Sequence, residues 1–288
     1  MKLEVNHVSK SYGNNLALND FSHSFTEGIY ALLGPNGSGK STLMNIITQN
    51  LKNDRGEILL DGVPTTKQGE RFRSQLGFMP QYPGLYPTFG VSEFLMYISK
   101  LKGVERSEAK KQTEKLLETV ELSDVSGKKI GTLSGGMKQR LSLAQALIGD
   151  PKIIILDEPT AGLDPRQRIS VRNFLAKLAL NRIIIIATHM VTDVEYTARE
   201  IIMMKKGVIE EFGTTEQLIA NSKDTVWNVV CRPDEVTQFQ SKFKVTNIST
   251  SENGVLIRML SDTKPCEDAV NVTPTLEDEY FRVFSQNC

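Results

Sequence analysis

One glycine-rich segment constrains this chain more than any other feature: Gly34-Pro35-Asn36-Gly37-Ser38-Gly39-Lys40-Ser41. It follows an apolar run that reads as a strand and precedes a predicted helix. Glycines let the backbone wrap closely around phosphate groups, and the helix N-terminus adds a partial positive charge. We therefore expect this segment, together with Thr42, to bind the phosphates of a nucleotide. Lys40 would contact the phosphates, and Ser41 would ligate Mg²⁺.

A second apolar run, at residues 153–156, ends in two acids, Asp157 and Glu158. The carboxyl end of a buried parallel strand lies beside the phosphate loop in folds of this kind. Asp157 can then hold Mg²⁺, directly or through water. Glu158 can polarise the attacking water as a general base. Alone, the pair could equally be two surface acids, but the phosphate loop in the same chain favours a catalytic site.

A second glycine-rich turn, Leu133-Ser134-Gly135-Gly136-Met137, precedes a helix predicted at residues 138–148. It offers another anion site at a helix N-terminus. One nucleotide has one set of phosphates, so two such sites suggest a nucleotide held between two chains. The alternative is that Ser134 only caps the helix.

The apolar patterns predict an α/β fold. The runs at 30–33, 153–156 and 183–187 are continuous, as in a parallel sheet covered by helices, here expected at 41–51 and 167–180. Residues 3–25 and 57–60 read as antiparallel strands, and 91–121 as a helical insertion. Phe94, Leu95, Ile98 and Leu101 form one apolar stripe of that insertion. From residue 222 the pattern predicts a small α+β unit, with strands at 225–231, 245–249 and 255–260 and helices at 234–243 and 276–284.

Taken in order, the motifs resemble those of the ATP-binding cassette (ABC) ATPases over about residues 1–220. Phe78-Met79-Pro80-Gln81 resembles the family's glutamine loop, Ala161-Gly162-Leu163-Asp164 its D-loop and Thr188-His189 its switch histidine. The resemblance implies a P-loop (RecA-like) core with an N-terminal antiparallel β subdomain. It also implies a nucleotide-binding domain at 1–221, a helical subdomain at about 82–140 and an accessory domain at 222–288.

The resemblance also implies roles for single residues. Tyr12 would stack on the adenine of ATP, the alternative being an ordinary sheet tyrosine. Gln81 would contact Mg²⁺ or the attacking water, and His189 would hydrogen-bond the γ-phosphate. Ser134, Gly135, Gly136 and Met137 would contact the nucleotide of a second copy, and Asp164 would cross the dimer interface. Met137 stands where the family usually has Gln, but the neighbouring N–H groups and the Ser134 hydroxyl remain, so we expect hydrolysis to be retained.

Composition limits the partners. Lys plus Arg and Asp plus Glu each number 34, so the basic excess typical of nucleic-acid binders is missing. No apolar run approaches the ~20 residues that span a bilayer. We therefore expect a cytoplasmic protein that contacts the cell membrane only through a separate permease subunit. The aromatic loop at 81–89 is a candidate contact for that subunit, the alternative being packing against the helical insertion.

The last motif concerns cargo. Residues 273–281, Thr-Pro-Thr-Leu-Glu-Asp-Glu-Tyr-Phe, resemble a Pro-x-Leu-Glu-Asp-x-Phe ending seen in ATPases of exporters of drugs, antibiotic peptides and polysaccharides. We therefore expect an ATP-bound homodimer that powers export of a peptide or drug-like compound. The alternatives are the ATPase of an ABC importer, or an ABC ATPase that does not act in transport.

Overall fold

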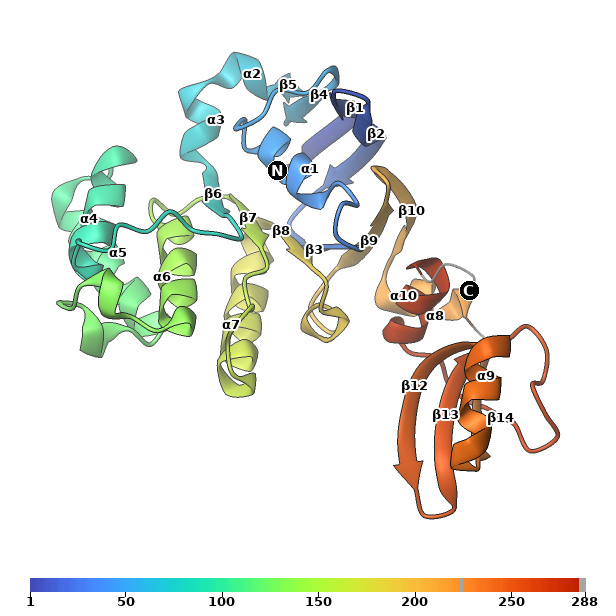
Figure 1. The fold of residues 1–288 in the computed structure, drawn as a ribbon. Coiled ribbons are helices and arrows are strands. Elements are labelled where there is room, and N and C mark those ends of the chain that lie inside the picture. The colour runs from blue at the N-terminus through green and yellow to red at the C-terminus, as the bar shows by residue number, and fades with distance from the viewer. Residues whose placement is uncertain (223–224, 285–288) are drawn as a thin grey trace.

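A six-stranded sheet runs through the centre of the molecule (Figure 1). The computed structural model describes residues 1–222 and 225–284, so residues 223–224 and 285–288 of the expected accessory domain lie outside the described residues. The strand order is β10-β9-β3-β8-β7-β6, parallel except for β10. The strands are β3 (Gly28–Leu33), β6 (Leu76–Met79), β7 (Ile153–Asp157), β8 (Ile183–Thr188), β9 (Glu200–Lys205) and β10 (Val208–Gly213). The predicted parallel α/β core is confirmed.

A second, antiparallel sheet covers one face of the core. Its order is β2-β1-β4-β5, and its strands are β1 (Leu3–Tyr12), β2 (Asn15–Phe25), β4 (Arg55–Leu60) and β5 (Val63–Pro64). Two short helices, α2 (Thr65–Gln68) and α3 (Glu70–Ser74), lead from β5 back to β6. The antiparallel strands predicted from alternation at 3–25 and 57–60 therefore belong to one sheet.

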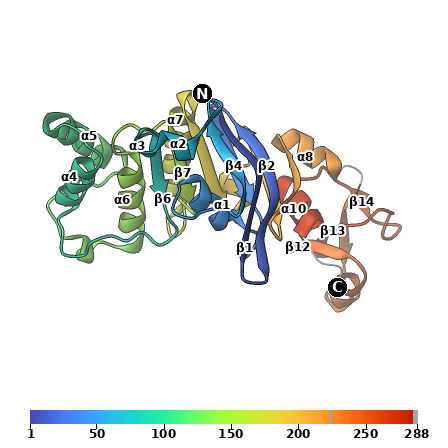
Figure 2. The same ribbon diagram turned by 90° about the horizontal axis from the view of Figure 1, so that it is seen from above.

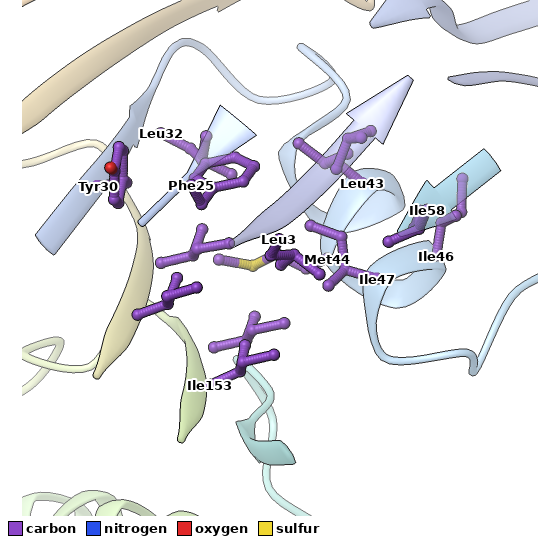
Figure 3. Packing of buried hydrophobic residues seen from close by; sticks show 14 of the residues in the cluster. Leu3, Phe25, Tyr30, Leu32, Leu43, Met44, Ile46, Ile47, Ile58 and Ile153 are labelled. Atoms are coloured by element: carbon purple, nitrogen blue, oxygen red, sulfur yellow. The ribbon is translucent and has the colours of Figure 1, made fainter. Parts of the chain in front are cut away.

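Helix α1 (Lys40–Ile47) lies between the two sheets. Leu43, Met44 and Ile47 on α1 pack with Leu3 of β1 and Ile153 of β7 (Figure 3). All five side chains are fully buried. This packing fixes the first turn of α1, and with it the phosphate loop, against the end of the central sheet. The helix ends at Ile47, earlier than the predicted 51.

The opposite face of the central sheet packs against a second layer of helices. These are α6 (Gly135–Leu147), α7 (Pro165–Leu178) and α8 (Thr215–Asn221), joined by α10 (Leu276–Phe284) from the end of the chain. Alternate residues of each central strand point into the two cores, as the pleat requires. Both faces of the sheet are therefore buried, which explains its continuous apolar strands.

The helical insertion contains α4 (Val91–Leu101) and α5 (Arg106–Thr119), followed by 3₁₀ turns at Ser123–Val125 and Ile130–Thr132. Phe94 and Leu95 are buried in its core and Ile98 packs beside them. The prediction for Leu101 was wrong, because its side chain is 65% exposed. Leu101 is the last residue of α4, where the chain turns away, so the stripe ends one turn early.

The C-terminal unit is a four-stranded sheet, β12-β13-β11-β14, with one helix. Its elements are β11 (Val226–Cys231), a 3₁₀ turn at Pro233–Glu235, α9 (Val236–Lys242), β12 (Lys244–Ser251), β13 (Gly254–Leu260) and β14 (Val270–Asn271). It lies at the opposite end of the molecule from the helical insertion in both views (Figures 1 and 2). Helix α10 does not join the unit's own small core. It packs instead with the helical layer of the central sheet, where Leu276 is fully buried beside Leu218.

Candidate nucleotide-binding site

The phosphate loop connects β3 to α1 and is shaped by two glycines that no other residue could replace without strain. Gly34 and Gly39 have φ values of 154° and 104°. A Cβ atom on Gly34 would lie 2.2 Å from the Met204 carbonyl oxygen, and one on Gly39 would lie 2.5 Å from that of Ala17. The loop therefore needs glycine for both its conformation and its close backbone contacts.

Lys40, the first residue of α1, holds the loop from inside. Its ammonium group donates to the carbonyl oxygens of Gly34 (2.6 Å) and Pro35 (3.1 Å) and to the Ser38 hydroxyl (3.2 Å). Burial lowers the pKa of Lys40, and the nearby acids Asp157 and Glu158 oppose that shift. A buried cation at the N-terminus of α1 makes this loop a site for an anion.

The two expected metal ligands lie next to each other. The Ser41 hydroxyl donates to Asp157 Oδ2 at 3.0 Å, although the two residues are 116 positions apart in sequence. Burial raises the pKa of Asp157, the Ser41 hydrogen bond partly offsets this, and Glu158 adds to it by like-charge repulsion. A bound cation would relieve that repulsion. Within the described residues, no cluster of three or more His, Cys, Asp or Glu side chains forms a metal site made of protein ligands alone.

Glu158 is held in an unusual backbone conformation directly after β7. Its φ is 52°, in the left-handed region, which costs an L-residue about 1–2 kcal/mol. The carboxylate accepts hydrogen bonds from the Thr188 hydroxyl (3.1 Å) and from the His189 N–H (3.1 Å). The Nδ1 atom of His189 lies 2.7 Å from the same carboxylate. Such strain is typical of residues whose position serves a function.

An open cleft of about 220 Å³ gathers these residues. It is lined by Asn36–Thr42 of the loop and α1, by Tyr12 at the end of β1, by Gln81 after β6, by Asp157 at the end of β7 and by Glu158 directly after it. Tyr12 is 51% exposed, and the Lys10 ammonium lies 6.0 Å from the centroid of its ring. Tyr12, residues 36–42, Gln81, Asp157 and Glu158 thus lie around one cleft, whereas Gly34, Pro35 and His189 do not line it. His189 is connected to the cleft through its contacts with Glu158.

The second glycine-rich turn does not line this cleft. Ser134 and Gly135 are exposed at the N-terminus of α6, and the Ser134 hydroxyl accepts a bond from the Met137 N–H at 3.3 Å. Asp164 caps α7 in the same way, accepting from the Gln167 N–H at 2.9 Å. Both residues therefore have a local capping role. Met137 packs partly against the core of the helical insertion.

Two contacts of Glu158 were not anticipated from sequence. Thr188 was noted only as part of a motif with His189, yet it is fully buried and bonds the carboxylate. Gln139, on α6, donates from Nε2 to the Glu158 carbonyl oxygen at 2.7 Å. A bond from a side chain to a distant backbone oxygen leaves no pattern in sequence, so only the fold could show it.

Comparison with known proteins agrees with this geometry. The family model described as ABC transporter matches residues 18–161. The chain belongs to the ABC transporter family. It is similar to the Nod factor export ATP-binding protein I of Burkholderia orbicola (strain AU 1054), with 37% identity over 71% of this chain and 68% of that one. It is also similar to the linearmycin resistance ATP-binding protein LnrL of Bacillus subtilis (strain 168), with 34% identity over 75% of this chain and 70% of that one.

Among solved structures, the fold matches the dimeric ATP-binding cassette MJ0796 in a post-hydrolysis state bound to ADP and Pi. The TM-score is 0.68 at 28% identity, covering 74% of this chain and 98% of that one. The cassette described here is accordingly an ATPase subunit of an ABC transporter. Across the described residues, no helix is both long enough and apolar enough to span a membrane.

Proposed function

We propose that two copies of this chain close on two ATP molecules and use their hydrolysis to drive a separate membrane subunit. The observation that carries the proposal is the cleft, which brings Tyr12, Lys40, Gln81, Asp157 and Glu158 together from four separate segments. The Ser134–Gly136 turn, with Ser134 and Gly135 exposed, lies outside that cleft, so it is available to a nucleotide bound by a second copy. The dimeric arrangement of the MJ0796 cassette supports this reading.

Each residue then has a defined task. Lys40 and the loop N–H groups bind the β- and γ-phosphates, and Tyr12 stacks on the adenine. The oxygen atoms of Ser41, Asp157 and Gln81 suit Mg²⁺, which prefers oxygen ligands and would neutralise phosphate charge when bound. Glu158 accepts a proton from the attacking water. His189 orients that water and the γ-phosphate.

The second copy completes the site. The α6 N-terminus of the partner directs the N–H groups of Ser134, Gly135 and Gly136 at the γ-phosphate, beside Met137 and Asp164. Closure excludes water from the phosphates and strengthens these charge interactions. Hydrolysis divides the charge between ADP and phosphate, and the dimer opens. The chain thus works as a homodimer in its ATP-bound state.

The surface for the membrane subunit is the aromatic loop after Gln81. Leu85 and Phe89 pack against the helical insertion, as one of the two sequence interpretations expected. Tyr82 is 84% exposed, and Tyr86 is 47% exposed beside Tyr97, at a centroid distance of 6.1 Å. Tyr86 and Tyr97 form a partly apolar surface suited to a docked helix, and Tyr82 precedes Tyr86 in the same loop. The protein would then lie on the cytoplasmic face of the cell membrane through that contact.

Export is the direction we favour. Two similar proteins are named for Nod factor export and for linearmycin resistance. The chain shares with exporter ATPases the ending around Leu276, Glu277 and Asp278. A peptide or drug-like compound is the cargo class that this similarity suggests.

The test of the catalytic assignments is ATP binding and phosphate release by purified variants. Lys40→Ala should lose ATP binding. Glu158→Gln should bind ATP normally and release phosphate at least 100-fold more slowly, the usual loss when a general base is removed. The control is Glu118→Gln, an exposed acid of α5, which should match the wild-type protein. A Glu158→Gln variant that turns over ATP at the parental rate would contradict the assignment.

A further inference from the structure

The carbonyl group of Glu158 is anchored to the helical layer by a side chain with no assigned role. Gln139 Nε2 donates to this carbonyl oxygen at 2.7 Å, which is shorter than the 3.2 Å bond from the Ala161 N–H to the same oxygen. On the other side, the Glu158 N–H donates to the Ala187 carbonyl oxygen at 2.8 Å. Both peptide groups that flank the Glu158 side chain are therefore fixed.

This anchoring matters because Glu158 has a φ of 52°. An L-residue leaves the left-handed region readily unless its neighbours hold it there. Rotation of either flanking peptide would swing the carboxylate away from Thr188 and His189. The bond from Gln139 opposes that rotation, so it helps to keep the carboxylate aimed into the cleft.

Gln139 also lies between two parts of the fold. It lies on α6, which is capped by Ser134 and begins at Gly135 and Gly136, the segment proposed to touch the partner's nucleotide. The next residue, Arg140, is buried and donates to the carbonyl oxygens of Val120 (2.6 Å) and Glu121 (2.9 Å) in the helical insertion. Adjacent residues of one helix thus bind the helical insertion and the catalytic strand end.

We propose that Gln139 is a positioning residue for hydrolysis: it holds the Glu158 peptide through its Nε2 atom and passes movement of α6 to the catalytic carboxylate. Because α6 is rigid, a displacement of its N-terminus by the partner's nucleotide also displaces Gln139, which lies further along the same helix. Contact in one site therefore sets the geometry of Glu158 in the other site. This inference rests on the proposed role of Glu158 as general base.

The test uses the full-length chain with two substitutions at this position. Gln139→Met keeps the side-chain length and removes the donor, and Gln139→Glu keeps the shape and places an acceptor against the carbonyl oxygen. Gln145→Met is the matched control. It lies on the same helix, is partly buried, and makes no side-chain hydrogen bond within residues 1–222 and 225–284.

Steady-state ATP hydrolysis distinguishes a role of Gln139 in positioning Glu158, which changes kcat, from a role in binding ATP, which changes KM. Both Gln139 variants should lose about tenfold in kcat, equal to about 1.4 kcal/mol of barrier height and close to the worth of one hydrogen bond. Their KM should stay within about twofold of the wild-type value, because Gln139 does not line the cleft. Gln145→Met should keep the wild-type kcat.

A second readout tests whether the loss is merely structural. In a Glu158→Gln background, adding Gln139→Met should leave ATP-dependent dimerisation intact. The inference is overturned if Gln139→Met keeps the parental kcat, if Gln145→Met loses as much, if the double variant no longer dimerises, or if neither Gln139 variant folds. A Glu158→Gln chain with the parental rate would instead refute the proposed function itself.

Discussion

Substituting Asp278 with alanine should detach the C-terminal sheet from the cassette. Asp278 is 1% exposed in the first turn of α10, a helix that packs on the cassette core. Its carboxylate accepts bonds from Arg258 of β13, through Nη2 at 2.7 Å and through Nε at 2.9 and 3.1 Å. It also accepts from the N–H and hydroxyl of Thr275, both at 2.8 Å. One carboxylate therefore caps the helix and ties the sheet to it.

The expected loss can be estimated from these contacts. Breaking a buried ion pair by removing one partner costs about 3–5 kcal/mol. Arg258 keeps 22% of its side chain exposed, so part of its charge can be hydrated in the variant. We therefore expect the lower end, about 3 kcal/mol. Arg258→Met should lose a similar amount, and the double variant should lose less than the sum, because the two residues share one interaction.

The assay is urea unfolding followed by tryptophan fluorescence. The chain has a single tryptophan, Trp227, which lies in β11 and donates to the Ser261 carbonyl oxygen at 2.9 Å. Its emission therefore reports on the C-terminal sheet. The control is Glu277→Ala, an exposed acid in the same helical turn, which should change stability by less than about 0.5 kcal/mol.

The pH dependence gives a second check. Burial opposes ionisation of Asp278, but the bonds from Arg258 and Thr275 outweigh it and hold its pKa below the usual value. Because the pKa of Asp278 is lower in the folded protein than in the unfolded chain, its ionised carboxylate stabilises the fold above about pH 4. This stabilisation is lost as the pH falls through the folded-state pKa. The difference between the wild type and Asp278→Ala should shrink over that range. An Asp278→Ala variant within 0.5 kcal/mol of the wild type at pH 7 would refute the reasoning.

Three further predictions concern other parts of the molecule. Burial lowers the pKa of Lys102 to about 8. The folded protein therefore binds this proton less tightly than the unfolded chain does, so the free energy of unfolding should rise from about pH 8 toward pH 10. Urea unfolding followed by circular dichroism should show this rise. The Lys102→Met variant should not show it. Met137→Gln should change the kcat of ATP hydrolysis by no more than about fivefold, a change within the free energy of one hydrogen bond. A gain of orders of magnitude would contradict the proposal that the backbone of this turn binds the anion. Tyr82→Ala should leave ATP hydrolysis by the isolated chain unchanged and reduce co-purification of the membrane subunit, whereas full recovery of that subunit would exclude this surface.

Local chemistry explains why so much of the fold and the cleft could be predicted. The glycines of residues 34–39 and the acids after the 153–156 run are contiguous signals whose geometry follows from the strand, loop and helix around them. The Ser41–Asp157 bond joins two such signals, because parallel strands present their carboxyl ends at one edge of a sheet.

Contacts that depend on tertiary structure could not be predicted. The apolar stripe gave no sign that α4 stops at Leu101. The pattern from residue 222 onward suggested one accessory unit, yet α10 packs on the cassette. Asp278 of α10 binds the sheet through Arg258 of β13 and Thr246 of β12. Gln139 is a polar residue on a mostly buried helix, and its partner is a backbone oxygen. Side-chain identity alone predicts no such partner.

The central claim is that ATP is held between two copies of the chain. Light scattering of Glu158→Gln, with and without ATP, tests it most directly, because a variant that binds but does not hydrolyse ATP should accumulate the closed form. We predict a shift from monomer to dimer mass that requires ATP and is absent when Lys40→Ala is added. A chain that remains monomeric with saturating ATP would contradict the claim that the Ser134–Gly136 turn completes the site of a second copy.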